Sequence, residues 1–311
     1  MSNPQKILVA YDGSPHSKAA LSWALLLSSD ENVELDVIKV FEPINLYFDF
    51  SVKLVERYSQ LEKEDRQMME EVKSFCERCG KTKVYAEVLK GHVASTLLDY
   101  ARQAGVDLIV TGTKGHGALE EMLMGSVTSS LASLSKVPVL IVKEQEAPTR
   151  LQNILVAYDD SDSSKAALDL AIDIGKLVNA KILAVKVADS KAFAVIDSIS
   201  GSDSGSAAKL KSLLDELSET EIKLMDEAKA AAALKGTAIA TELLPTGNVA
   251  DSILKYAAKM NSDLIVAGTL GHGFLEGVLI GSVTRNLISL SQLPVLVVKS
   301  KKNHPVLSDI P

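Results

Sequence analysis

Two segments of the sequence place glycines and hydroxyl side chains at the same spacing. The first runs Gly112-x-x-Gly115, nine further residues, then Gly125-Ser126-Val127-Thr128. The second carries the same pattern at Gly268, Gly271, Gly281, Ser282, Val283 and Thr284. Glycine lets a backbone approach an oxyanion closely, and the free N–H groups at the start of a helix favour phosphate. One Gly-x-x-Gly would fit a simple strand–helix turn, but the repeated pattern predicts a phosphate loop in each half, with Ser126 and Thr128 as added hydroxyl donors.

Neither loop carries the chemistry of an efficient phosphoryl-transfer enzyme. Such enzymes usually place a lysine on the phosphates within a Gly-Lys-Ser/Thr loop. Lys114 in the first segment is replaced by Leu270 in the second. His116 and His272 share one loop position, where a phosphate contact and a solvated histidine both remain open, and neither has an evident nucleophile partner. We therefore expect at most slow hydrolysis of a bound nucleotide and predict no catalytic residues.

The remaining candidates for chemistry favour a structural interpretation. Cys76-x-x-Cys79 lies at the end of a charged helical segment, without the further ligands that zinc needs and without an equivalent in the second half. We interpret this pair as two reduced thiols on a helix surface. The single tryptophan, Trp23, lies on an apolar helical face and is expected in the core.

Strands and helices alternate around these loops. In the first half the expected strands are Lys6–Tyr11, Val33–Val40, Lys83–Val88, Asp107–Gly112 and Pro138–Val142. The expected helices are Ser17–Leu27, Leu54–Cys79, Val93–Ala104 and Val127–Leu134, with Ser14-Pro15 as a helix cap. Continuously apolar strands separated by helices predict a parallel, doubly wound α/β sheet with helices on both faces. Ligands of such sheets bind beyond the carboxyl ends of the strands, where the glycine segments lie.

The chain is a tandem repeat. ILVAYDGSPHSKAAL at Ile7–Leu21 matches ILVAYDDSDSSKAAL at Ile154–Leu168, an offset of 147 residues. The glycine segments match at an offset of 156 residues, so the second copy carries an insertion, for which the Ser/Gly-rich stretch Ser198–Ser206 is the best candidate and is expected to form a mobile outer loop. The sequence predicts domains at 1–146 and 151–301, joined by a short polar linker.

Composition narrows the class of protein. Hydrophobic residues make up 47% and charged residues 23% of the 311 residues, as in ordinary globular chains. The formal net charge of −7 argues against nucleic-acid or anionic-membrane partners. The N-terminus shows no export signal and no apolar run approaches the length of a membrane span, which predicts a cytoplasmic protein.

The pattern Gly-x2-Gly-x9-Gly-Ser, set between a strand and a final helix with a Pro-Val-Leu strand, resembles the universal stress proteins over nearly the whole chain. It matches the subgroup that binds ATP. The resemblance implies a five-stranded parallel sheet in each copy and a regulatory, stress-response role in which ATP, or AMP or ADP, binds together with Mg²⁺. A slow ATPase and an interaction scaffold with empty cavities are the alternatives.

The resemblance also assigns further residues to the site. Asp12 and Asp159 match an acidic residue near the adenine, and Val40 and Val187 match a residue whose backbone meets the base. The glycine, serine, valine and threonine residues of both segments match ribose and phosphate contacts. The last strands, Pro138–Val142 and Pro294–Val298, are expected to pair within the chain, leaving other faces for an unidentified protein partner or for a homodimer.

The second copy departs from this pattern at its first strand–helix turn. It has Asp159-Asp160-Ser161-Asp162 where the first copy has Asp12-Gly13-Ser14-Pro15. Three carboxylates near a triphosphate could repel it or help to hold a divalent cation, and they could equally form a solvated acidic first turn of a helix.

Overall fold

The computed structural model describes residues 4–30, 32–42, 52–115, 124–188, 204–271 and 280–300, with the backbone alone at 52–55 and 204–218. Residue contacts divide the chain into two compact units. The first unit consists of Ser2–Arg150 with Ile288–Val297, and the second of Leu151–Leu287 with Val298–Pro311. Ile288–Val297 belongs to the first unit because the strand in this segment pairs with residues Val139–Ile141 of that unit. The predicted domain boundaries, 1–146 and 151–301, remain a prediction.

The first unit is built on a parallel sheet with the strand order β3-β2-β1-β4-β5. Its elements are β1 (Lys6–Ala10), α1 (Pro15–Leu27), β2 (Glu34–Phe41), α2 (Val52–Arg78), β3 (Val84–Lys90), α3 (Val93–Gln103), β4 (Leu108–Gly112), α4 (Ser126–Leu134) and β5 (Val139–Val142). All nine agree with the predicted ranges to within two residues at each end. β10 (Val295–Val298) runs antiparallel to β5, with Leu296 opposite Leu140. This is the pairing expected of the last strands of the two copies.

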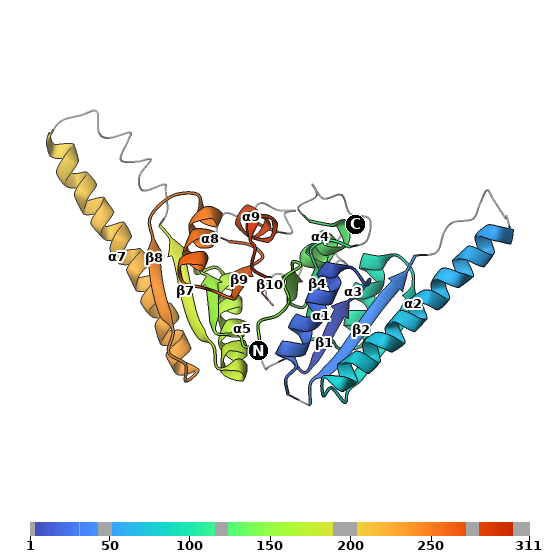
Figure 1. The fold of residues 1–311 in the computed structure, drawn as a ribbon. Coiled ribbons are helices and arrows are strands. Elements are labelled where there is room, and N and C mark those ends of the chain that lie inside the picture. Colours follow the sequence, from blue (N-terminus) through green and yellow to red (C-terminus); the bar gives the residue numbers. More distant parts are fainter. Residues whose placement is uncertain are drawn as a thin grey trace. The chain divides into compact units, whose positions relative to one another are not determined.

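The second unit repeats this arrangement with the parallel strand order β9-β6-β7-β8. Its elements are β6 (Asn153–Ala157), α5 (Asp162–Val178), β7 (Lys181–Val187), α7 (Ser204–Leu234), β8 (Ala240–Leu244), α8 (Val249–Lys259), β9 (Leu264–Gly268) and α9 (Ser282–Leu290). In Figure 1 the long helices α2 and α7 each run beside the outer strands of their own unit. The chain thus consists of two tandem α/β copies with mainly parallel strands, as predicted.

Apolar strands form the centre of each sheet because helices cover both faces. Ile7, Leu8 and Val9 of β1 are fully buried, as are Leu155 and Val156 of β6. In a right-handed doubly wound sheet, α1 and α2 cover one face, and α3 packs with α4 on the other. The alternation of elements therefore fixes which loops meet at the carboxyl edge.

The start of α1 follows the expected capping chemistry. The hydroxyl of Ser14 accepts a hydrogen bond from the N–H of Ser17, and Pro15 occupies the first helical turn, where its missing N–H costs nothing. Further along this helix, Trp23 is 2% exposed and belongs to the core, as predicted.

The expectation that both cysteines lie on the surface is wrong, and the expected insertion lies partly outside the described residues. The Cys76 thiol is buried, so the two cysteines are not both on the surface, although both are free and Cys79 is exposed. Burial raises the pKa of the Cys76 thiol to about 12, which keeps it protonated and unreactive. Of the proposed insertion, residues 198–203 lie outside the described residues, whereas residues 204–206 begin α7.

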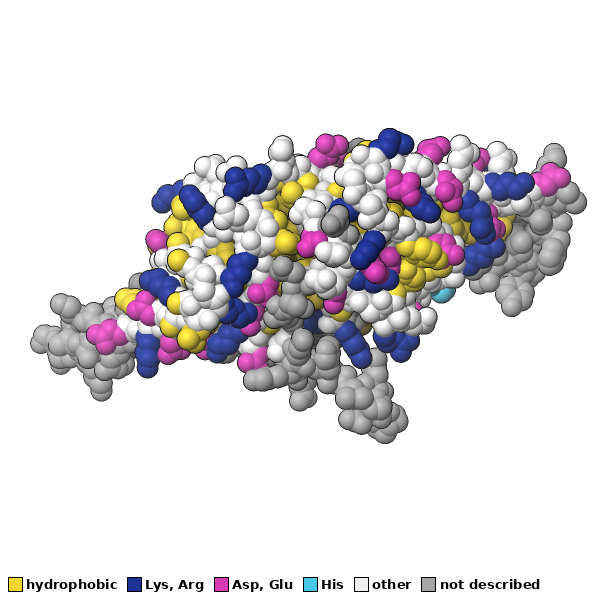
Figure 2. All heavy atoms as spheres, turned by 90° about the horizontal axis from the view of Figure 1, so that it is seen from below, with side chains coloured by type: hydrophobic (Ala, Val, Ile, Leu, Met, Phe, Trp, Pro, Cys, Tyr) yellow, Lys and Arg dark blue, Asp and Glu magenta, His cyan; other side chains and the backbone are white. Residues whose placement is uncertain are grey.

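Within the described residues, no helix has the length and apolar character needed to span a bilayer. Figure 2 shows basic and acidic side chains interspersed over one face of the molecule.

Candidate functional site

The first copy has a cavity of about 660 Å³ at the carboxyl edge of its sheet. The strand order reverses between β1 and β4, which is the switch point where doubly wound sheets bind ligands. Every residue predicted for this site lines the cavity: Asp12, Val40, Gly112, Gly115, Gly125, Ser126, Val127 and Thr128. The structure therefore brings together residues from four separate segments of the copy.

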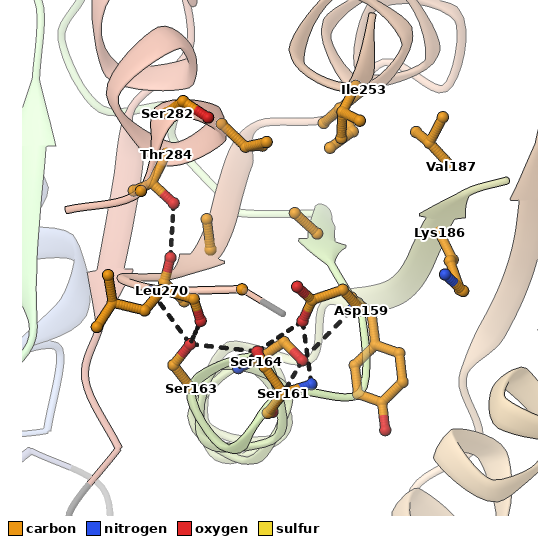
Figure 3. A pocket seen from close by; sticks show the side chains of 18 of the residues that line it. Asp159, Ser161, Ser163, Ser164, Lys186, Val187, Ile253, Leu270, Ser282 and Thr284 are labelled. Carbon is orange, nitrogen blue, oxygen red and sulfur yellow. Dashed lines mark hydrogen bonds between the residues drawn. The ribbon is translucent and has the colours of Figure 1, made fainter. Parts of the chain in front are cut away.

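The second copy has an equivalent cavity of about 610 Å³. Its lining includes all the predicted residues of that copy: Asp159, Val187, Gly268, Gly271, Gly281, Ser282, Val283 and Thr284. In Figure 3 Asp159 lies near the middle of the lining, between Val187 on one side and Ser282 and Thr284 on the other.

Each aspartate is held by the turn that follows its strand. The Oδ1 atom of Asp12 accepts hydrogen bonds from the backbone N–H of Ser14 at 3.0 Å and from its hydroxyl at 2.6 Å. Asp159 accepts the same pair of bonds from Ser161, at 3.1 and 2.6 Å. Since the serine also caps the next helix, one turn fixes both the carboxylate and the helix start.

The second glycine of each loop leaves room for that aspartate. A Cβ atom at Gly115 would lie 2.7 Å from Oδ2 of Asp12, closer than real Cβ contacts allow. At Gly271 a Cβ atom would collide with Oδ2 of Asp159 in the same way. Glycine at both positions therefore allows the close approach of loop and carboxylate, and a Cβ atom there would have to displace the carboxylate.

A different contact explains the first glycine of each loop. A Cβ atom at Gly112 would lie 2.6 Å from Cβ and 2.9 Å from the carbonyl carbon of His16, so it would strike the backbone of α1. At Gly268 a Cβ atom would lie 2.7 Å from the carbonyl carbon of Ser163 in α5. These glycines let a helix pack tightly on the end of β4 or β9.

The threonines hold the two glycine segments together. The Thr128 hydroxyl donates to the carbonyl of Gly112 at 2.6 Å, and the Thr284 hydroxyl donates to the carbonyl of Gly268 at 2.6 Å. Each hydroxyl hydrogen is used within the protein in this structure, and the expected contact of Thr128 with a phosphate stays a prediction. The hydroxyl of Ser126 remains suited to that task, because Ser126 is exposed at the cavity.

Helix α4 presents its positive end to the cavity. It begins after Gly125, which provides no side-chain cap, and Ser126, Val127 and Thr128 form its first turn. The first N–H groups of a helix have no partner four residues earlier, and the helix dipole adds a partial positive charge. The Gly125 N–H is used elsewhere, donating to the Thr113 carbonyl at 2.8 Å. An oxyanion in the cavity can therefore meet the first-turn N–H groups.

The additional carboxylates of the second copy do not line the cavity. Asp160 forms an ion pair with Lys165 at 2.8 Å and accepts a hydrogen bond from the hydroxyl of Tyr158 at 3.1 Å. Asp162 is the first residue of α5, where the helix dipole favours an acid. Within the described residues no three acidic, histidine or cysteine side chains gather as a metal site. The structure thus favours the acidic first turn over a cation site or a repulsive cluster.

Sequence reasoning missed His16, which borders the first loop. Its Nδ1 atom is 3.1 Å from the hydroxyl of Thr113, and its Nε2 atom is 3.5 Å from a carboxylate oxygen of Glu144. Burial lowers the pKa of His16, partly offset by the nearby Glu144. The second copy has Ser163 at this position, so comparison of the copies gave no signal.

Further charged residues line the cavities. Lys114, noted in the sequence as the loop lysine of the first copy, lines the first cavity, whereas Arg285 of α9, which the sequence analysis missed, lines the second. Lys39 and Lys186 line the two cavities from equivalent positions in β2 and β7. The loop histidines, His116 and His272, lie outside the described residues.

Fold and site together define a tandem α/β protein with a loop-bounded cavity at the switch point of each copy. The model of the Universal stress protein family matches residues 3–143 and again residues 150–299. The chain therefore belongs to the universal stress protein family.

Individual relatives agree with this assignment. A universal stress protein of Mycobacterium tuberculosis is 25% identical over 316 residues, covering 94% of each chain. The universal stress protein YxiE of Bacillus subtilis is 33% identical over 148 residues, covering 44% of this chain and 98% of its own length. The crystal structure of a universal stress protein from Archaeoglobus fulgidus has a TM-score of 0.68 at 20% identity, covering 95% of this chain and 98% of its own. That structure supports the fold.

Proposed function

We propose that this chain is a nucleotide-binding regulatory protein that holds ATP, or AMP or ADP, in the cavity of each copy. The observation that carries the proposal is the shared construction of the two cavities. Each combines an aspartate held by a capped turn, a loop whose glycine admits that aspartate, and residues from the start of a helix.

The cavity chemistry suits the two ends of a nucleotide. The start of α4 or α9, with Ser126 or Ser282, would hold the phosphates. Val40 or Val187, at the end of the second strand, would contact the base. Volumes of about 610 and 660 Å³ fall within the range of about 300–1,000 Å³ typical of small-molecule sites.

Mg²⁺ would arrive with the phosphates. This ion usually keeps several waters and binds nucleotide phosphates with one or two carboxylates. Asp12 and Asp159 are the carboxylates that lie beside the glycine loops of the two cavities, and within the described residues no three acidic, histidine or cysteine side chains gather as a metal site. The protein's part would be to position the phosphates that bind the metal.

Efficient turnover does not fit these sites. The two cavities share no lysine in their phosphate loops, and neither described lining contains a histidine. We expect ATP hydrolysis well below the median enzyme rate of about 10 per second. Hydrolysis near that rate, abolished by His116→Ala, would favour the ATPase alternative.

A charge placed at the helix start tests nucleotide binding without weakening the fold. Glutamate in the first turn stabilises a helix through its dipole, but at Ser126 and Ser282 it would repel a phosphate. We expect calorimetry to show ATP binding to the wild type and at least a tenfold loss in the double variant Ser126→Glu/Ser282→Glu. Ser95→Glu is the matched control, because it puts the same charge in the first turn of α3, outside the cavity lining.

Mass spectrometry of nucleotide released from the denatured, freshly purified protein identifies the natural ligand. Absence of nucleotide, together with no binding of ATP, ADP or AMP, would overturn the proposal and favour the scaffold alternative. In this proposal the protein acts in the cytoplasm, where nucleotide binding changes its affinity for a protein partner or for a second copy of the chain.

A further inference from the structure

Each cavity is lined by a lysine of the second strand that forms an ion pair with the long helix, and the family pattern does not account for this pair. Lys39 of β2 lies 3.8 Å from a carboxylate oxygen of Asp65 in α2. Lys186 of β7 lies 3.5 Å from a carboxylate oxygen of Glu221 in α7. Each pair joins the second strand of a copy to its long helix.

The two pairs are equivalent in the fold. The N–H of Tyr11 donates to the carbonyl of Ile38, just before Lys39, and the N–H of Tyr158 donates to the carbonyl of Val185, just before Lys186. The carboxylates are 156 residues apart, the same offset that relates the glycine segments. Both members of the pair are therefore retained between the copies.

The surrounding helix surface has not been retained in the same way. Arg66 follows Asp65, whereas Ile222 follows Glu221, and both are exposed. Further along, the exposed Phe75 is matched by an alanine in α7. Exposed acids such as Glu70 and Asp226 are retained as well, so the case for Asp65 and Glu221 rests on their pairing with a lysine that lines the cavity.

Stability alone gives a weak reason to keep these pairs. The side chains of Lys39 and Asp65 are 17% and 20% exposed, and those of Lys186 and Glu221 are 14% and 15% exposed. Ion pairs withdrawn this far from water lose much of their attraction to desolvation. Separations of 3.5 and 3.8 Å also exceed a good N–H···O hydrogen bond.

The lysines lie at the nucleoside end of the cavity. Figure 3 shows Lys186 beside Val187, across the cavity from Ser282 and Thr284. Lys39 and Asp65 both line the first cavity, next to Val40. With the phosphates at the helix start, the base faces the ion pair.

We propose that each lysine–carboxylate pair recognises the edge of an adenine base that carries N7 and the 6-amino group. This inference rests on the proposed nucleotide function. An ammonium group only donates hydrogen bonds and a carboxylate only accepts them. The lysine donates to N7 and the carboxylate accepts one hydrogen of the amino group, which leaves the other edge of the base to the backbone of Val40 or Val187.

Base analogues test this assignment without changing the protein. 7-Deaza-ATP lacks the N7 acceptor, and ITP presents an oxygen in place of the amino group. Hydrogen bonds to charged groups correspond to roughly ten- to hundredfold in affinity, so we expect calorimetry to show each analogue binding wild-type protein at least tenfold more weakly than ATP. Equal affinity for ATP and 7-deaza-ATP would overturn the role of the lysines.

Protein variants separate recognition of the base from general damage. In Lys39→Met/Lys186→Met, the difference between ATP and 7-deaza-ATP should vanish. In Asp65→Asn/Glu221→Gln, the preference for ATP over ITP should fall, and the part that remains is expected from the backbone of Val40 or Val187 at the other edge of the base. Glu70→Gln/Asp226→Asn is the matched control, because these exposed acids occupy equivalent positions five residues further along the same helices and do not line the cavities.

The outcomes distinguish the two proposals. If the wild type binds none of these nucleotides, the proposed function itself is wrong and the assignment of the ion pairs falls with it. If ATP binds but the analogues bind equally well, only the assignment of the ion pairs is wrong.

Discussion

The three glycines of the first loop should respond differently to alanine, because an added Cβ meets a different neighbour at each. At Gly112 it would lie 2.9 Å from a backbone atom of α1, which cannot move without moving the helix. At Gly115 it would meet only Oδ2 of Asp12, the end of a side chain. At Gly125 the nearest atom is the Thr113 carbonyl oxygen at 3.3 Å, a contact that a small shift relieves.

These contacts give an expected order for stability and another for binding. Overpacking a tightly packed site typically costs about 1–3 kcal/mol, and Gly112→Ala should fall in the upper part of that range. For a unit of this size, 2 kcal/mol lowers Tm by about 4–8 °C. Gly115→Ala should cost less than about 1 kcal/mol but displace Asp12, weakening ATP binding at least tenfold. Gly125→Ala should lower Tm less than Gly112→Ala does and weaken ATP binding less than Gly115→Ala does.

Differential scanning calorimetry and titration calorimetry on the same preparations separate these effects. Gly268, Gly271 and Gly281 provide an independent repeat of the series, since their Cβ contacts follow the same order. The reasoning fails if Gly112→Ala unfolds at the wild-type temperature. It also fails if Gly115→Ala lowers Tm as much as Gly112→Ala does.

Other predictions concern single side chains. Burial lowers the pKa of His16 in the folded protein, so below about pH 6.5 the unfolded chain binds more protons than the folded one. The free energy of unfolding should therefore fall as the pH drops below this value. His16→Gln should make Tm depend less on pH in that range. Native protein should react with iodoacetamide once, at Cys79, and twice after denaturation, because the pKa of Cys76 is raised to about 12; mass spectrometry counts the adducts. Asp160→Gly should leave ATP affinity at the second site unchanged in calorimetry, because this carboxylate is paired with Lys165 away from the cavity, and tighter binding would restore the repulsion hypothesis.

The parts predictable from sequence were those encoded by local pattern or by the repeat. Continuous apolar runs identified the strands because both faces of a parallel sheet are buried. The glycine spacing located the cavities because phosphate loops follow strands at the carboxyl edge. Contacts between distant segments were not predictable in this way. Asp65 reaches the cavity because α2 packs on β2, and no spacing relates it to Lys39.

Local hydrogen bonding also directs the side chains of some correctly located residues. Thr128 lines the cavity, but its hydroxyl hydrogen is directed to Gly112, a choice that residue type alone does not decide. Similarly, Asp160 stands beside Asp159 in sequence yet faces Lys165. It has a positive φ of 67°, in the turn where the first copy uses Gly13 with a φ of 83°. The turn conformation, rather than the charge of the segment, determines which carboxylate reaches the cavity.

The two copies share the hydrogen-bonded part of the site but differ in the charged residues around it. The shared part consists of the aspartate and its serine, the glycines, and the threonine that hydrogen-bonds the two loop segments together. The cationic side chain that lines the cavity near the glycine segments is not retained, since Lys114 lines one cavity and Arg285 the other. Because Arg285 lies on the helix and Lys114 on the loop, they would meet different parts of a phosphate chain. The two cavities are therefore expected to bind one class of ligand with different dependence on the number of phosphates.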